Sequence, residues 1–118
     1  MHDRLSDVRS NQEALEWYQS HSPKDADVAA HHVECLINQG NFWDHSGYPE
    51  HALEFTQQAI LVGKLHSFDS PAVPSDTVSA MYRAGHLLCV LGPYDDAVIA
   101  SLDAIDFART VWPTLAIW

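Results

Sequence analysis

The side chains with the clearest capacity for chemistry are the histidines, of which the chain has eight among 118 residues. His31 lies four residues after Asp27 and four residues before Cys35, with His32 and Glu34 beside it. On a helix this spacing places Asp27, His31 and Cys35 on one face, as the ligands of a zinc ion can be placed. The stretch therefore permits two interpretations, a metal site or histidines on a partly exposed helix surface.

The sequence lacks the motifs that would make these side chains a recognisable site. It contains no CxxC pair, no HExxH motif and no calcium-binding loop. A nucleophile elbow, a phosphate-binding loop and a glycine-rich dinucleotide motif are also missing. Cys35 and His31 could form a thiol–imidazole dyad, but thiol and imidazole neighbours arise by chance in a histidine-rich chain. We predict no catalytic residue, no metal and no cofactor; the alternative is a histidine-rich helical bundle that binds a metal and could be an enzyme.

The composition is that of one acidic globular domain. A length of 118 residues suffices for a single compact domain, and a hydrophobic content of 47% argues against disorder. The formal net charge is −10, from 6 Lys and Arg against 16 Asp and Glu. Because nucleic acids and anionic membranes are bound through cations that pair with phosphate, neither is a predicted partner. The charge either keeps the protein soluble or favours a basic protein partner.

Neither the cysteines nor the first residues indicate export. Cys35 and Cys89 both lie in helical patterns, which predicts buried, reduced thiols. Residues 1–17 contain no apolar run of the kind found in signal peptides. No stretch reaches the roughly 18 apolar residues of a membrane span. We expect a cytoplasmic protein.

Two glycine-containing turns divide the helical patterns into pairs. Apolar and small residues recur at steps of three and four residues on both sides of Gly47 and of Gly92, as in amphipathic helices. Gly92 suits the left-handed residue that ends a helix, and Pro93 suits the first turn of the next helix. The sequence therefore predicts an all-α protein of about five helices.

The helices form one predicted domain. Its parts are a first helix at 5–20 that is a partial repeat or a cap, a first helix pair at 26–65, a second helix pair at 76–111, and an apolar tail at 112–118. Residues 67–75 contain two prolines and are expected to be a loop. Ser75 or Asp76 is expected to cap the helix that follows.

The two helix pairs repeat the same small and apolar positions. Five matched pairs are each separated by 45 residues: Gly40 and Gly85, Gly47 and Gly92, Ala52 and Ala97, Ala59 and Ala104, Ile60 and Ile105. A fixed period of this size is typical of repeat arrays, in which each helix pair buries its apolar face on the next. We therefore expect close helix contacts at Gly40, Ala52, Gly85 and Ala97.

The second pair resembles a tetratricopeptide repeat at Gly85, Gly92, Tyr94, Ala97 and Ala104. In that family small residues occupy the positions where the paired helices touch. The usual period is about 34 residues, and the additional residues of this chain lie between Gly63 and Thr77, which resembles the kinesin-light-chain subgroup with its long repeats. The resemblance implies antiparallel helix pairs stacked as a short superhelix, and a non-enzymatic scaffold that binds proteins.

The resemblance also implies a groove lined by the first helix of each pair. The residues carried over to the groove are Glu34, Ile37, Asn38, Asn41, His45, Ser79, Tyr82, Arg83 and His86. Asn38, Asn41 and Arg83 resemble the clamp with which the family holds a peptide's C-terminal carboxylate, but the clamp's lysines are missing and Ile37 stands at one such place. A groove for an extended or helical peptide is therefore expected. The alternative for each residue alone is an ordinary solvated helix position.

The last eight residues are almost wholly apolar. The tail contributes Trp112, Leu115, Ile117 and Trp118 without the polar cap with which repeat arrays usually end. Exposed apolar patches mark interfaces, so we expect a homo-oligomer, most simply a twofold dimer, through the last helix and these four residues. The alternatives are a tail that folds back as a private cap, and a chain that is a fragment of a longer array.

Overall fold

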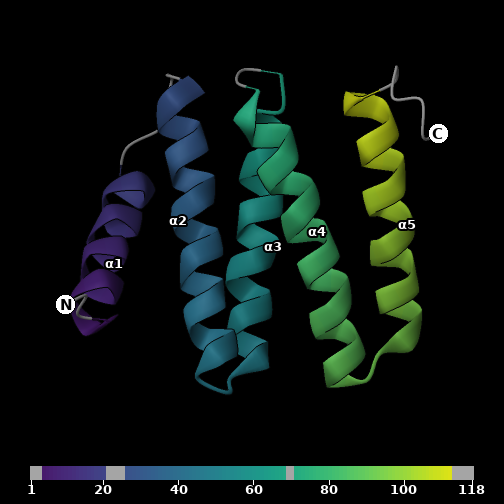
Figure 1. The fold of residues 1–118 in the computed structure, drawn as a ribbon, viewed down its shortest axis with the longest axis horizontal. Coiled ribbons are helices and arrows are strands. Elements are labelled where there is room, and N and C mark those ends of the chain that lie inside the picture. Colours follow the sequence, from purple (N-terminus) through teal and green to yellow (C-terminus); the bar gives the residue numbers. More distant parts are fainter. Residues whose placement is uncertain (1–3, 21–25, 69–70, 113–118) are drawn as a thin grey trace.

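Five α-helices make up the computed structural model of the protein, which describes residues 4–20, 26–68 and 71–112 (Figure 1). They are α1 (Arg4–Ser20), α2 (Ala26–His45), α3 (Pro49–Leu65), α4 (Ala72–Leu91) and α5 (Tyr94–Val111). No strand occurs in these ranges. The predicted all-α class and the predicted number of helices are confirmed.

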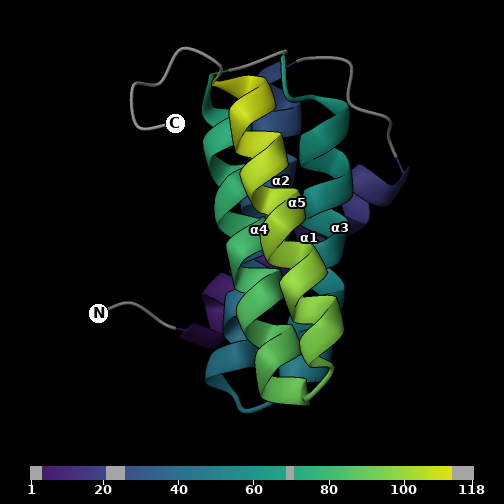
Figure 2. The same ribbon diagram turned by 90° about the vertical axis from the view of Figure 1, so that its right-hand side faces the viewer.

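Neighbouring helices run antiparallel and pack side by side in the order of the chain (Figure 1). Each helix contacts the next one, and α2 also contacts α4, so the first helices of the two pairs touch directly. Viewed from the α5 side, the five helices lie behind one another as a stack (Figure 2). This arrangement places α2 and α4 next to each other, as a shared groove requires.

The two turns within the helix pairs use glycine in the same backbone conformation. Gly47 has φ +87° and Gly92 has φ +110°, values that residues other than glycine rarely adopt. The N–H of Gly92 donates to the carbonyl of Leu88 at 3.0 Å and so closes the last turn of α4. Both glycines thus end the first helix of a pair, as their separation of 45 residues predicts.

In the first pair, α2 and α3 approach each other at Gly40. A Cβ atom on Gly40 would lie 3.1 Å from the Thr56 hydroxyl oxygen and 3.3 Å from the Ala52 carbonyl oxygen. Ala52 has no exposed surface, and the buried Thr56 hydroxyl donates to the Ala52 carbonyl at 2.7 Å. The contact therefore leaves little room for a side chain at Gly40.

The second pair repeats this contact 45 residues later. A Cβ atom on Gly85 would lie 3.2 Å from the Ser101 hydroxyl oxygen. That hydroxyl donates to the carbonyl of Ala97 at 3.0 Å, and Ala97 is buried. The close helix contacts expected at the four small positions are confirmed in both pairs.

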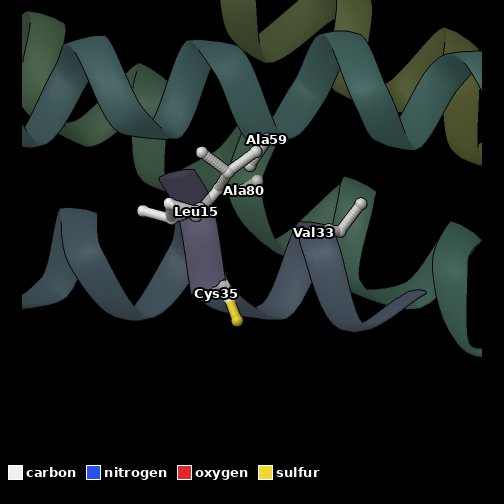
Figure 3. Close-up of a cluster of buried hydrophobic side chains, with 6 residues drawn as sticks. Leu15, Val33, Cys35, Ala59 and Ala80 are labelled. Carbon is white, nitrogen blue, oxygen red and sulfur yellow. The ribbon is translucent and has the colours of Figure 1, made fainter. Parts of the chain in front are cut away.

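A continuous apolar core joins the first four helices. Its central cluster contains Leu15, Val33, Cys35, Leu36, Ala59 and Ala80 (Figure 3). Two apolar positions are buried in both helix pairs: Val33 of α2 corresponds to Val78 of α4, and Leu36 of α2 corresponds to Met81 of α4. Half-buried Phe55, Ile60 and Val62 of α3 pack against the cluster.

The loop predicted at 67–75 is shorter than expected, because α4 begins at Ala72. Pro74 lies in the first turn of α4 and is buried. Its missing N–H costs nothing there, since the first four N–H groups of a helix have no partner within the helix. The predicted caps at Ser75 and Asp76 are therefore wrong, and the residue before the helix is Pro71.

The two cysteines differ in burial, so the prediction of two buried thiols is wrong for one of them. Cys35 is buried and Cys89 is exposed, and both are free thiols. Of the predicted tail interface, Leu115, Ile117 and Trp118 lie outside the described residues, while Trp112 is half-buried. The predicted dimer stays a prediction. Within the described ranges, no helix has both the length and the apolar character of a membrane span.

A substitution at Gly63 tests how closely α3 and α4 pack. A Cβ atom there would lie 2.0 Å from the hydroxyl oxygen of Thr77, which is fully buried and donates to the Val73 carbonyl at 2.6 Å. Because the helices must separate, we expect Gly63→Ala to lower the free energy of unfolding by about 1–3 kcal/mol. Urea denaturation measures this loss.

The same substitution in a Thr77→Ala background is the control. In that background Gly63→Ala should lower the free energy of unfolding by less than it does in the parent, because the Thr77 hydroxyl oxygen that the new Cβ would meet is gone. Alanine is favoured over glycine inside an unstrained helix by about 1 kcal/mol. A Gly63→Ala protein that is more stable than the parent would therefore contradict the close contact.

Candidate functional site

The surface of α2 carries two adjacent hollows. The smaller has a volume of about 220 Å³ and lies between α2 and α4, where Ile37, Asn41, Ser79 and Arg83 line it. The larger, of about 650 Å³, lies between α1 and α2. Asn41 lines both hollows, so they adjoin at this side chain, on two sides of the same stretch of α2.

The structure brings together most of the residues carried over to the groove. Those that line a hollow are Ile37, Asn38, Asn41, His45, Ser79 and Arg83. The other three, Glu34, Tyr82 and His86, are exposed and line neither hollow. Burial, and then the charge of Glu34, raise the pKa of Asp76, so Glu34 lies near α4. We call the two hollows together the α2–α4 groove; α4 lines only the smaller hollow, and α1 lines only the larger one.

An ion pair crosses the groove between α2 and α4. The Arg83 guanidinium donates from Nη1 to Asp44 Oδ2 at 2.9 Å, and the two side chains are 39% and 30% exposed. A ligand carboxylate at Arg83 would therefore compete with Asp44, which the sequence did not reveal. Because a guanidinium has five N–H donors, one ion pair leaves capacity for a neutral acceptor such as a peptide carbonyl.

The side chain amides of α1 fix the other wall of the groove. Asn11 donates from Nδ2 to the Cys35 carbonyl at 2.8 Å and to Gln39 Oε1 at 2.9 Å. Gln39, which is 4% exposed, donates in turn to Gln12 Oε1 at 3.3 Å. These bonds satisfy a buried amide and set the position of α1 against α2.

The sequence prediction of the groove missed the contribution of α1. A signal was present, because Asn11 lies three residues after Val8 and four before Leu15, on the face that α1 buries. The larger hollow is lined by amide, hydroxyl, thiol, imidazole and apolar side chains, and by none of Asp, Glu, Lys or Arg. A neutral hollow in a chain of net charge −10 suits polar backbone groups better than a charged ligand.

The histidine cluster of α2 packs against α1. The Tyr18 hydroxyl and His31 Nδ1 share a hydrogen bond, and the Cys35 sulfur lies 3.8 Å from Nδ1 and 3.7 Å from Nε2 of the same ring. The His32 ring stacks on Tyr18, with ring centroids 4.5 Å apart and planes 19° from parallel. The cluster therefore contributes to the contact between the two helices.

The surroundings of Cys35 disfavour the thiolate form of its side chain. Burial, and then Glu34, raise the pKa of the Cys35 thiol, whereas a catalytic cysteine needs a stabilised thiolate. In the part of the chain that the structure describes, His, Cys, Asp and Glu form no group of three able to hold a metal ion. The side chain of Asp27, the third residue of the predicted ligand set, lies outside that part.

No protein-family profile, curated protein or solved structure matches the chain significantly. The interpretation as a tetratricopeptide-like array therefore rests on the 45-residue repeat and the helix contacts that repeat with it.

Burial of His32 predicts a loss of stability in acid. Its Nδ1 is buried and has no hydrogen-bond partner among the described residues. Burial, and then the neighbouring His66 and His31, lower the pKa of His32 from 6.5. As the pH falls through 6.5 the unfolded chain takes up this proton while the folded chain does not. The free energy of unfolding should therefore fall until the pH reaches the lower, folded pKa, and then level off.

Two measurements check this expectation. A histidine NMR titration should give His32 a pKa below 6.5. In urea denaturation, His32→Phe, which keeps a ring against Tyr18, should show a smaller loss of stability between pH 7 and pH 5 than the parent. Equal losses in the two proteins would contradict the role of His32.

Proposed function

We propose that this protein is a non-enzymatic interaction scaffold of the tetratricopeptide kind, which binds a peptide segment of a partner protein in the α2–α4 groove. The observation that carries the proposal is the pair of hollows that meet at Asn41. Six of the nine residues expected in the groove line one or both of them. The proposal needs no metal, cofactor or nucleophile.

The groove has the side chains that an extended peptide backbone requires. The carboxamides of Asn38 and Asn41 each offer donors and an acceptor, which match the N–H and C=O groups of a peptide. Arg83 lines the smaller hollow, pairs with Asp44 and adds further N–H donors. Half-buried Ile37 offers an apolar contact for a peptide side chain. Backbone pairing with a few side chain contacts is a common mode of peptide recognition.

The charge of the chain favours basic segments. The chain has 16 acidic against 6 basic side chains, and Glu34 of α2 lies near enough to Asp76 of α4 for its charge to contribute to the raised pKa of that carboxyl. Such a field raises the rate at which basic partners associate and disfavours nucleic acids and anionic membranes. The partner class we propose is therefore a protein segment with Lys or Arg beside an uncharged stretch.

A peptide-display selection on the full chain tests the proposed function. We expect selected peptides whose affinity falls about tenfold in Asn41→Ala and in Arg83→Ala, because each variant removes hydrogen-bond donors that the ligand uses. Fluorescence anisotropy with labelled peptides measures the dissociation constants.

Two variants separate binding from folding and from net charge. Asp44→Ala breaks the ion pair but keeps the Arg83 donors, so it should retain binding. Arg109→Ala removes the same charge from α5, outside the groove, and should bind as the parent does. Selected peptides that bind Asn41→Ala and Arg83→Ala as tightly as the parent would refute the groove, as would a selection that yields no peptide.

A further inference from the structure

The outward face of α5 is apolar and exposed. Tyr94, Val98 and Leu102 follow one another at steps of four residues and therefore share a face, with exposed fractions of 69%, 58% and 55%. Ile99, beside them on the helix, is 57% exposed. We call these four residues the α5 stripe. No later helix covers the stripe in the part of the chain that the structure describes.

Comparison with α3 shows that the helix pair itself does not require this stripe. Forty-five residues earlier, the position of Leu102 holds Gln57 and the position of Ile99 holds Glu54, and both are exposed. The two helices pack on their partners through the same small residues, so these positions are free to be polar. Apolar residues at both places on α5 point to a contact that the chain itself does not make within the described residues.

Four aspartates lie among and beside the residues of the stripe: on a helix of about 3.6 residues per turn, Asp95 and Asp106 fall between Leu102 and Ile99, and Asp96 and Asp103 lie beyond Ile99. Asp95 and Asp106 lie three and four residues from Val98 and Leu102, and Asp103 lies four residues from Ile99. Asp96 lies three residues from Ile99, and all four carboxylates are on exposed residues. The only basic residue in α5 is Arg109, which lies in the last turn, seven residues after Leu102 and so on the same side of the helix. The exposed side of α5 therefore carries four carboxylates and one guanidinium.

We propose that the α5 stripe docks an amphipathic helix of a partner protein whose apolar face is flanked by Lys or Arg. An apolar face with an excess of carboxylates among and beside its apolar residues is complementary to an apolar face that carries cations, and such a partner buries the stripe while it neutralises the aspartates. A second copy of this chain would instead bring two sets of four aspartates together. The stripe is a second surface, on a different helix from the groove, and it stands independently of the function proposed for the groove.

Two designed helical peptides of the same length as α5 test this proposal with the full chain. They share a leucine face and differ only in their flanking residues, which are Lys in one and Glu in the other. We expect the Lys peptide to bind, with amide chemical-shift changes concentrated on α5, and the Glu peptide not to bind. The affinity of the Lys peptide should fall with added salt, since part of the attraction is electrostatic.

Leu102→Gln introduces the residue that α3 has at the equivalent position, and it should lower the affinity for the Lys peptide about tenfold. Leu61→Gln is the matched control, because Leu61 is 70% exposed on α3 and not in the stripe, so this variant should bind as the parent does. Equal binding of the Lys and Glu peptides would overturn the proposal, as would shift changes away from α5 or an unchanged Leu102→Gln affinity. A parent dimer in sedimentation that Leu102→Gln dissociates would assign the stripe to a second copy instead.

These outcomes are separate from those for the groove. Asn41 and Arg83 lie on α2 and α4, so Asn41→Ala and Arg83→Ala should leave the affinity of the Lys peptide unchanged. Loss of peptide binding in these variants with no effect of Leu102→Gln would place the site in the groove and refute a site on α5.

Discussion

The close approach of paired helices at small residues is the constraint on which the rest of the structure depends. Gly40 meets Thr56 and Ala52 in the first pair, and Gly85 meets Ser101 in the second. A larger side chain at either glycine would rotate or separate its helix pair, because protein cores tolerate little added volume. Since this contact fixes which side of α2 faces α3, it also fixes which side carries the groove amides. The binding surface is thus a consequence of packing on another face of the same helix.

The sequence revealed what the repeat encodes and little else. The 45-residue offset located both glycine turns and the close contacts, because each rests on a residue type with a specific steric role. It could not reveal the ion pair between Arg83 and Asp44, which joins two positions with no counterparts of the same kind in the other repeat. The wall that Asn11 contributes was missed although Asn11 lies on the face that α1 buries, because the repeat does not extend to α1. Proline was overweighted as a loop residue, because a first-turn position such as Pro74 has no hydrogen bond to lose.

The polar and apolar surfaces of this protein have different physical properties. The larger hollow of the groove is neutral and rich in amides, which suits hydrogen bonding to a backbone. The α5 stripe is apolar with carboxylates among and beside its residues, which suits contact with a basic amphipathic helix. His31 and His32 have a third role. They join α2 to α1, because the His31 ring shares a hydrogen bond with the Tyr18 hydroxyl and the His32 ring stacks on the Tyr18 ring. The lowered pKa of His32 makes its contribution to stability depend on pH.

The central claim is that α2 and α4 together form the recognition surface. Amide chemical-shift mapping of the full chain with one display-selected peptide tests it most directly. The account predicts that the largest changes lie on α2 and α4 around Asn41 and Arg83, with smaller changes at Asn11 on α1. Changes concentrated on α3 or α5, with α2 and α4 unaffected, would contradict it.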